Sequence, residues 1–190
     1  MSEVLTTGEV AKHCGVNFRT VIRWIERGYL KSFKLPGRGD NRIRAEDFVA
    51  FLQNNDMPVP PEYQALLRQA LVVDDDRNMS NSIRRVLVRA GYEVEVANDG
   101  FQAGAVLASK VPSVVLLDLM MPGVDGFEVL AYIRSESRLA ATKVLVISGL
   151  GEVELQRARD AGADAVLAKP FKNEELEQQV NALLGLSASK

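Results

Sequence analysis

Cysteine is almost absent from this sequence, because Cys14 is the single example among 190 residues. One cysteine forms no intrachain disulfide and no cysteine-based zinc cluster, and so low a content is typical of a reducing compartment. Long apolar runs are also lacking: stretches such as Val114–Leu117 and Val144–Ile147 have the length of strands, far below that of a membrane-spanning helix. The first fifteen residues lack the basic segment and apolar core of a signal peptide. These absences predict a cytoplasmic protein without a membrane partner.

The remaining composition, 47% hydrophobic and 25% charged, is that of an ordinary globular protein of one domain plus a small module. Charge is divided unevenly along the chain. Residues 1–55 carry nine Lys and Arg against six Asp and Glu, whereas residues 56–190 carry fourteen against nineteen. Eight of the basic residues lie within Arg19–Arg44. This pattern fits a polyanion-binding module joined to an acidic domain, or a solvated charged face, and charge alone leaves both open.

A boundary between two domains is predicted at Asn54–Pro61, where the run NNDMPVPP contains two Asn, one Asp and three Pro. Such a segment continues neither a helix nor a strand. We therefore expect a first domain over residues 1–54, a linker over 55–69 and a second domain over 70–190. Within and just beyond the linker, Glu62–Ala70 is expected to form two helical turns, with Tyr63, Leu66 and Leu67 on one side.

The first domain begins with two short helices. Thr6 and Glu9 have the spacing of a capping box, which predicts a helix that ends at a glycine turn. Asn17 then caps a second helix over Phe18–Arg27, closed by Gly28. Two helices joined by so short a turn form a helix-turn-helix unit.

The second helix has an outer face suited to the major groove of DNA. Val21 and Ile25 lie four residues apart and face the core, so polar side chains fall on the other side. Arginine reads guanine bidentately, asparagine reads adenine, and threonine contacts phosphate or a thymine methyl group. The residues expected to contact DNA from this helix are Asn17, Arg19, Thr20 and Arg23.

A basic hairpin follows over residues 31–44, KSFKLPGRGDNRIR, in which two alternating segments flank a Pro- and Gly-containing tip. Its cations are placed to contact backbone phosphates, as a wing beside the recognition helix. They are Lys31, Lys34, Arg38, Arg42 and Arg44, of which Lys34, Arg38 and Arg42 are the main candidates. A last helix over Ala45–Gln53 closes the small core.

The whole segment from LTTGEVAKHCG to RAEDFVAFL resembles the excisionase/MerR-like winged helix-turn-helix family. In that family the second helix enters the major groove and the wing follows the DNA backbone, so the resemblance implies double-stranded DNA as partner. Helix-turn-helix units also serve as adaptors that bind proteins. The arginines of the outer helix face and the wing favour DNA.

The second domain alternates apolar strands with amphipathic helices. The expected strands are Leu71–Asp74, Val94–Ala97, Val114–Asp118, Val144–Ser148 and Ala165–Ala168. The expected helices are Met79–Ala90, Gly100–Ser109, Phe127–Ser135, Glu152–Ala161 and Asn173–Leu184. Nearly continuous apolar strands separated by helices predict an α/β fold, a doubly wound five-stranded parallel sheet covered on both faces.

Functional residues are expected at the carboxyl ends of these strands, where doubly wound sheets bind their ligands. Asp74 and Asp75 follow the first strand, Asp118 the third, Ser148 the fourth and Lys169 the fifth. Carboxylates gathered at one edge repel each other, and Mg²⁺ is the cation that carboxylates, water and phosphate oxygens hold together. A carboxylate in such a site can accept a phosphoryl group as an acyl phosphate.

At these residues the motifs LVVDDD, VVLLDLMMPGVDGFEVL, VLVISGL and AVLAKPF look like the receiver domain of two-component response regulators, over about residues 70–187. The resemblance implies that Asp118 is the phosphoacceptor and that a histidine kinase or phosphotransfer protein is the partner. It implies a Mg²⁺ site and two residues for the phosphoryl oxygens. The Mg²⁺ ligands would be Asp74, Asp75, Asp118 and the backbone carbonyl of Met120, and the phosphoryl-binding residues Ser148 and Lys169. Pro122 and Gly126 would shape the loop after Asp118, and Pro170 would follow a cis peptide bond.

Two features depart from that family. Val166 occupies the position, three residues before Lys169, where an aromatic side chain usually turns inward on activation. The order of domains is also reversed, because receivers commonly precede their output domain. The usual route of control from the last receiver helix into a following linker is therefore absent.

These observations predict a transcriptional regulator, not an enzyme, whose DNA affinity is controlled by phosphorylation of Asp118. Pairing of receivers into a homodimer through Glu152–Ala161 and Asn173–Leu184 would bring two DNA-binding modules together. One alternative is a non-transcriptional phosphorelay adaptor whose N-terminal module docks on a protein. Another is a receiver that works unphosphorylated as a constitutive dimer. A phosphatase using the same carboxylates is disfavoured, since the chain offers no cap domain and no further acid–base group.

Overall fold

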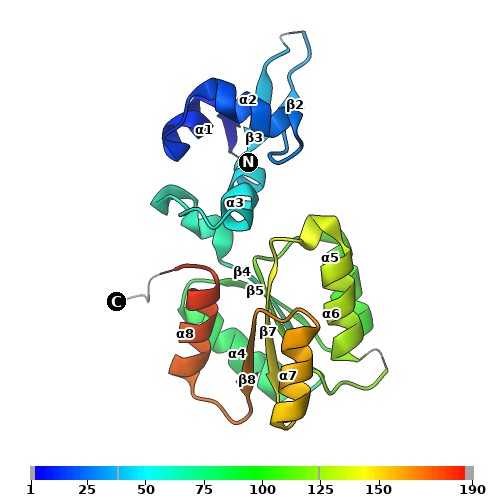
Figure 1. The fold of residues 1–190 in the computed structure, drawn as a ribbon. Helices are drawn as coiled ribbons and strands as arrows, with labels where there is room; N and C mark the ends of the chain where they lie inside the picture. Colours follow the sequence, from blue (N-terminus) through cyan, green and yellow to red (C-terminus); the bar gives the residue numbers. More distant parts are fainter. Residues whose placement is uncertain (1–2, 38, 124, 187–190) are drawn as a thin grey trace. The chain divides into compact units, whose positions relative to one another are not determined.

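The computed structural model describes residues 3–37, 39–123 and 125–186, and the chain divides into two compact units, Met1–Leu66 and Leu67–Lys190 (Figure 1). Each unit has a sheet of its own. None of the helices within these described ranges combines the length and apolar character that crossing a bilayer requires.

In the described part of the first unit, helices accompany a small antiparallel sheet with the strand order β1-β3-β2. Its elements are β1 (Val4–Thr6), α1 (Thr7–Cys14), α2 (Phe18–Glu26), β2 (Phe33–Lys34), β3 (Asn41–Arg44) and α3 (Ala45–Asn54). The predicted helices and hairpin are present, whereas strand β1 was not predicted. Three residues are too few to show an alternating pattern. Strand β1 forms only because Leu5 pairs with Ile43, a residue that follows both α1 and α2 in the sequence.

The local signals in the sequence act as expected. Thr6 and Glu9 form the capping box of α1, in which each side chain accepts a hydrogen bond from the other's backbone N–H. Asn17 Oδ1 accepts from the N–H of Arg19 at 2.9 Å and so begins α2. Gly28 adopts a φ of +75°, a conformation in which a Cβ is unfavourable, and it turns the chain out of that helix.

The segment between the domains differs from the prediction. Pro61–Leu67 forms a 3-10 helix, η1, rather than α-helical turns that reach Ala70. Ala70 instead lies in strand β4, where it pairs with Val94 and Val114, and this pairing ends the helix early. Tyr63 is buried within the first unit, where its ring contacts the rings of His13 and Phe48 at centroid distances of 5.4 and 5.8 Å.

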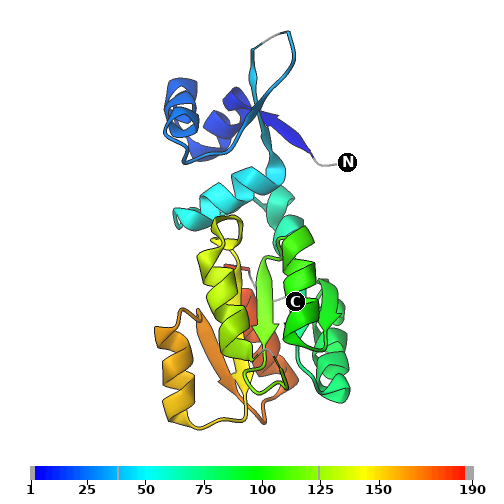
Figure 2. The same cartoon turned by 90° about the vertical axis from the view of Figure 1, so that its right-hand side faces the viewer.

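The second unit contains a five-stranded parallel sheet with the order β5-β4-β6-β7-β8, as the doubly wound prediction required. Its strands are β4 (Gln69–Val73), β5 (Glu93–Ala97), β6 (Val114–Leu117), β7 (Lys143–Ser148) and β8 (Ala165–Ala168). Its helices are α4 (Arg77–Arg89), α5 (Gly100–Ser109), α6 (Gly126–Ser135), the 3-10 turn η2 (Ser137–Leu139), α7 (Glu152–Asp160) and α8 (Asn173–Leu183). Helices α4 and α8 cover one face of the sheet, and α5, α6 and α7 the other (Figures 1 and 2).

A hydrophobic cluster of the core lies under α5, α6 and α7. Leu71, Val73, Leu117 and Val146 point into it from three neighbouring strands and are completely buried. Each fully buried aliphatic side chain of this size contributes about 1.5–3 kcal/mol to folding. Because the strands are parallel and tightly registered, packing at this cluster places all their carboxyl ends at one edge of the sheet.

A cluster of polar side chains lies at the amino edge of the same sheet, opposite the carboxyl ends of the strands. The hydroxyl of buried Tyr92 donates to Asn181 Oδ1 in α8 at 2.7 Å. The guanidinium of Arg68, which precedes β4, lies 5.4 Å from the centre of the Tyr92 ring and donates to the carbonyl of Ala90. Burial raises the pKa of Tyr92 to about 12; Arg68 opposes this shift and Glu177 adds to it.

Replacing Tyr92 by Phe should remove a pH dependence of stability. The raised pKa in the folded state means that the contribution of Tyr92 is complete below pH 10 and is lost as the pH rises toward 12. The wild type should therefore be more stable than Tyr92→Phe at pH 8, and this difference should shrink by on the order of 2 kcal/mol above pH 10. Urea unfolding at several pH values measures it, and a constant difference would contradict the assignment.

Candidate functional site

The carboxyl edge of the parallel sheet gathers the residues that the sequence analysis expected there. Asp74 and Asp118 follow β4 and β6 directly, Ser148 is the last residue of β7, and Lys169 follows β8. Backbone hydrogen bonds extend past the strand ends and fix these positions: Asp118 N–H donates to Val73 O at 2.8 Å, and Lys169 N–H to Ser148 O at 2.9 Å. The expected strands therefore end one residue earlier at Asp74 and Asp118, while the placement of the side chains is as predicted.

One ammonium group joins two carboxylates at this edge. Lys169 Nζ donates to Asp74 Oδ2 and to Asp118 Oδ2, each at 2.9 Å. Only 1% of Asp74 and 7% of Asp118 is exposed, so both charges depend on this pairing. Burial raises the pKa of Asp74, and the bonds to Lys169 offset only part of that effect. For Lys169 burial acts to lower the pKa, but the hydrogen bonds to Asp74 and Asp118 outweigh it and the pKa is raised.

The same edge offers an oxygen site for a hard divalent cation. One carboxylate oxygen from each of Asp74, Asp75 and Asp118 lies within 4.8 Å of the other two. Asp75 is exposed beside two buried partners, which leaves room for water molecules on a bound ion. Because three carboxylates face one ammonium, the site retains negative charge, and the donor set fits Mg²⁺. The residues that would hold Mg²⁺ are Asp74, Asp75 and Asp118, with the backbone carbonyl of Met120 as the fourth expected donor.

Hydrogen bonds to both of its oxygens orient the Asp118 carboxylate. Its Oδ1 accepts from the backbone N–H of Met120 at 3.1 Å, while its Oδ2 faces Lys169. Ser148 is completely buried and its hydroxyl accepts from the N–H of Leu150 at 3.3 Å. The Lys169–Pro170 peptide bond is cis, as the resemblance implied.

Gly126 holds the loop after Asp118 against the start of α6. A Cβ at this position would lie 2.2 Å from the Asp118 carbonyl oxygen and 2.6 Å from the Leu119 Cα. The Gly126 N–H donates to Leu119 O at 3.2 Å, so the two backbones meet directly. Asp125 and Glu128 form a capping box that begins α6 at the same point. Only glycine permits this close approach.

Asp76 has a role that the sequence analysis did not assign. Its Oδ1 accepts from the N–H of Asn78 at 2.8 Å and of Met79 at 3.4 Å, so Asp76 is the N-cap of α4. An aspartate directly before a helical pattern is the signal that identifies such a cap. Asp76 therefore faces the helix, in contrast to Asp74 and Asp75.

The expected DNA contacts of α2 lie on its outer side. Arg19 and Arg23 are exposed, and Arg23 donates to the hydroxyl of half-buried Thr20 at 3.3 Å. Asn17 is also exposed, but its Oδ1 is the cap of the helix. Reading adenine bidentately needs that same oxygen, so capping competes with base recognition at Asn17.

The hairpin does not present its cations on one side. Arg42 lies opposite Phe33 and Lys34 lies opposite Asn41, so the side chains of Arg42 and Lys34 leave opposite faces of the ribbon. Arg42 donates to Asn41 O at 3.1 Å, and the guanidinium of Arg44 lies 5.8 Å from the centre of the Phe33 ring. Arg38, the third expected wing contact, lies outside the described residues.

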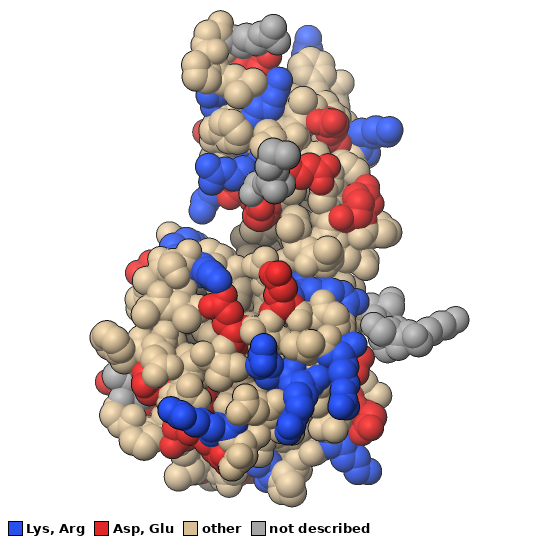
Figure 3. Space-filling model, turned by 180° about the vertical axis from the view of Figure 1, so that it is seen from behind, with Lys and Arg blue, Asp and Glu red and all other residues tan. Residues whose placement is uncertain are grey.

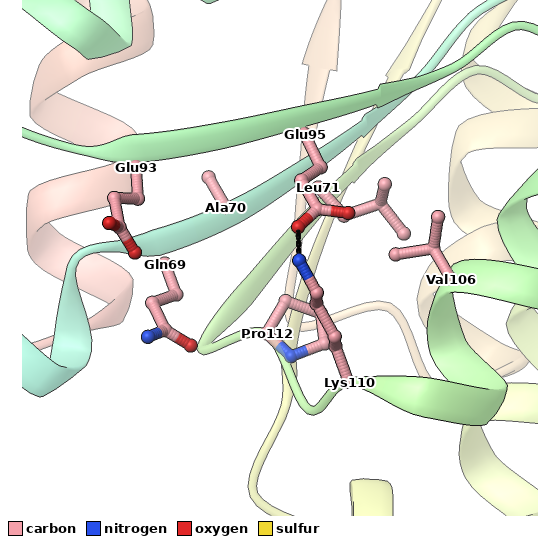
Figure 4. A pocket seen from close by; sticks show the side chains of 8 residues that line it. All are labelled: Gln69, Ala70, Leu71, Glu93, Glu95, Val106, Lys110 and Pro112. Atoms are coloured by element: carbon pink, nitrogen blue, oxygen red, sulfur yellow. Dashed lines mark hydrogen bonds and ion pairs between the residues drawn. The ribbon is translucent and has the colours of Figure 1, made fainter. Parts of the chain in front are cut away.

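A hollow of about 170 Å³ is found elsewhere in the second unit (Figure 4). It opens between β4, β5 and the end of α5, at the amino edge of the sheet. Figure 4 shows Lys110 directed at Glu95, with which it forms an ion pair. Gln69 and Glu93, the first residues of their strands, line the same hollow. The hollow is thus separated by the length of the strands from Asp118.

Comparison with known families agrees with this geometry. Residues 70–181 match the response regulator receiver domain family, and residues 4–56 match a helix-turn-helix domain family. Among curated proteins, the DNA-binding dual master transcriptional regulator RpaA of Synechocystis is 40% identical over 115 residues, which cover 60% of this chain and 48% of RpaA. Response regulator MprA of Mycobacterium avium is 45% identical over 115 residues, 60% of this chain and 50% of MprA. The chain spans about half the length of the curated relatives it matches, and neither name describes an enzyme.

Solved structures show the same receiver fold. The signal receiver domain of a response regulator from Bermanella marisrubri is 42% identical, with a TM-score of 0.58, over 62% of this chain and 98% of that one. The receiver domain of a sensor histidine kinase from Pseudomonas aeruginosa is 25% identical, with a TM-score of 0.58, over 62% of this chain and 98% of that one. That structure is described with a magnesium ion coordinated in its active site cleft.

Replacing Gly126 by Ala should destabilise the second unit by about 1–3 kcal/mol, because the new methyl group displaces the backbone at Asp118 and Leu119. Gly104, inside helix α5, has no atom within 4 Å of a built Cβ, so Gly104→Ala is the matched control. That variant should be unchanged or more stable by up to about 1 kcal/mol. Urea unfolding tests both, and equal stability of Gly126→Ala and the wild type would contradict the close approach.

Proposed function

Because this chain belongs to the response regulator receiver family, we propose that it is a DNA-binding transcriptional regulator controlled by phosphorylation of Asp118 by a histidine kinase or phosphotransfer protein. The bridge from Lys169 to Asp74 and Asp118 carries this proposal. It holds a carboxylate ready for phosphoryl transfer beside two further acidic groups, in a domain that is joined to a helix-turn-helix unit.

In the proposed reaction, an oxygen of Asp118 attacks the phosphorus of the donor. The new P–O bond forms as the bond from phosphorus to the donor group breaks, and the donor leaves with that electron pair. The ammonium of Lys169, already 2.9 Å from Asp118 Oδ2, is placed to pair with the oxygens of the transferred group. Ser148 lies at the end of the neighbouring strand, and because its hydroxyl only accepts from Leu150, its own hydrogen can be donated to a phosphoryl oxygen.

A bound Mg²⁺ would neutralise part of the charge that develops on the phosphoryl oxygens. Without such a cation, Lys169 is the single positive group in contact with Asp74 and Asp118 among the described residues. Asp75 contributes a third carboxylate near the two others and has no ammonium partner there. We therefore expect phosphorylation to require the divalent ion.

Residues 1–54 form the proposed DNA-binding domain, and the linker over 55–69 joins it to the receiver over 70–190. Arg19 and Arg23 on α2 would contact bases or phosphates in the major groove, with Thr20 beside them. Lys34 and Arg42 of the hairpin would contact the backbone from the two faces that the strand register separates, and Arg38 is the third proposed contact of the hairpin. Contact with DNA would place the protein in the cytoplasm.

Phosphorylation is proposed to pair two receivers through α7 and α8. Near its start helix α7 exposes Val153, which lines a shallow surface hollow together with Gln156 and Arg157. Each small module alone would bind one DNA half-site weakly. In a pair, binding of the first module would raise the effective concentration of the second at its half-site, so the pair would bind DNA more tightly. Val166 is half-buried against the core where an aromatic switch usually lies, so a signal to this face must travel by another contact.

Incubation with acetyl phosphate and Mg²⁺ should add one phosphoryl group to the wild type, detected by intact mass under conditions that preserve acyl phosphates. Asp118→Asn should gain none. Asp76→Asn is the control, because asparagine keeps the N-cap of α4 while removing a neighbouring carboxylate, and it should be phosphorylated normally. Phosphorylation of Asp118→Asn, or of the wild type with EDTA present, would contradict the assigned site.

Binding to DNA should depend steeply on salt through Arg19 and Arg23. Each lost phosphate contact reduces the slope of log K against log[salt] by about 0.9, so Arg19→Gln with Arg23→Gln should reduce it by up to about 2. The control, Lys12→Gln with Arg27→Gln, removes the same charge from exposed positions of the same unit. Titration of labelled duplex at several salt concentrations measures both slopes. No binding by the wild type even at low salt would favour a protein-docking adaptor.

A further inference from the structure

Helix α4 of the receiver exposes arginines without any acidic residue. Its sequence, RNMSNSIRRVLVR, contains four arginines and no Asp or Glu. All four, Arg77, Arg84, Arg85 and Arg89, are exposed. The rest of the second unit is acidic: residues 67–190 carry ten Lys and Arg outside α4, against seventeen Asp and Glu. The positive charge of α4 is therefore a local feature that the average charge of the domain conceals.

The four arginines share the solvent side of the helix. Ile83, Val86 and Leu87 are buried and mark the side of α4 that faces the sheet. Arg85 and Arg89, four residues apart, lie opposite that buried side, whereas Arg77 and Arg84, seven residues apart, form a second exposed row about 100° around the helix. We call these two rows together the α4 arginine face. In Figure 3 lysine and arginine side chains gather together on this side of the receiver.

The fold does not use these charges. Within the described ranges, none of the four guanidinium groups forms a hydrogen bond or an ion pair. Arg134 shows the contrast, because its guanidinium donates to Gly162 O, Thr142 O and Asp164 Oδ2 and joins three segments. Arg77 also lies in the first turn of α4, where a positive charge opposes the helix dipole and reduces stability. Folding therefore gives no reason for this charge, which is instead free to bind an anionic partner.

We propose that the α4 arginine face binds the phosphate backbone of the DNA that the N-terminal module holds. This inference rests on the proposed function. Guanidinium groups match phosphate oxygens bidentately. From Arg77 to Arg89 the helix extends roughly 18 Å, over which a duplex presents on the order of ten phosphate charges. Exposed arginines spread along the length of one helix fit such a repeating line of charge.

The covalent connection keeps the duplex within reach of this face. The chain between the end of α3 at Asn54 and the start of β4 at Gln69 spans at most roughly 50 Å when fully extended. DNA bound to the first unit is therefore present at a high effective concentration beside the second. An acidic protein surface has no comparable connection to this chain, which is why DNA is the occupant proposed.

The test compares three full-length proteins on two duplexes. The variant Arg84→Gln, Arg85→Gln, Arg89→Gln removes three charges from the α4 arginine face. The control Lys110→Gln, Arg138→Gln, Lys143→Gln removes three charges from ion pairs elsewhere on the receiver, outside α7 and α8. Affinities are measured by fluorescence anisotropy over a range of salt, with a duplex of about 12 base pairs and one of about 35. The shorter duplex has the length for one small module, whereas the longer one leaves further phosphates available for a second contact.

On the long duplex the α4 variant should bind about 10- to 100-fold more weakly than the wild type, with a salt slope smaller by up to about 3. The control should bind like the wild type, and on the short duplex all three should agree. Equal affinity and salt slope for the variant and the wild type on the long duplex would overturn the inference. If the variant also lost phosphotransfer, the partner of the α4 arginine face would be an acidic protein surface instead of DNA. Absence of wild-type binding to either duplex would instead overturn the proposed function.

Discussion

The bridge from Lys169 to Asp74 and Asp118 is the interaction on which the functional edge of the sheet depends. A parallel sheet brings the ends of β4, β6 and β8 together, and with them charges that are unfavourable in a buried setting unless they are paired. The core under α5, α6 and α7 holds these strands in register, and Gly126 lets α6 approach the backbone of Asp118. Among the described residues Asp75 has no cationic partner, so the site keeps the surplus of negative charge that suits a divalent ion.

Most of the second unit could be predicted from the sequence because its central strands β4, β6 and β7 are buried on both faces and appear as apolar runs. Asp74, Asp118, Ser148 and Lys169 follow from the same logic, since topology alone brings strand ends together. Contacts between distant segments could not be predicted. Strand β1 exists only through its pairing with β3, and the register of β2 with β3 decides that Lys34 and Arg42 lie on opposite faces. The α4 arginine face was not predicted, because apolar spacing marks only the buried side of a helix and carries no information about its exposed side.

The two units carry charges of opposite sign, and this separation suits a regulator that uses one unit for DNA and the other for phosphate chemistry. The order of the units makes the connection unusual, because the linker reaches the receiver at its first strand. Arg68 lies at that entry point and contacts the ring of Tyr92, which in turn donates to Asn181 in the last helix. The entry of the linker and helix α8 are therefore in physical contact through one aromatic side chain, in a receiver where Val166 replaces the usual aromatic switch.

The most direct test of the account is a titration of a duplex with the full chain, in the presence and absence of acetyl phosphate with Mg²⁺, at two salt concentrations. The account predicts salt-sensitive binding that becomes tighter with the phosphodonor in the wild type and does not change in Asp118→Asn. Salt-sensitive binding that is indifferent to the phosphodonor in the wild type would contradict it, since the chemistry at Asp118 would then have no influence on DNA.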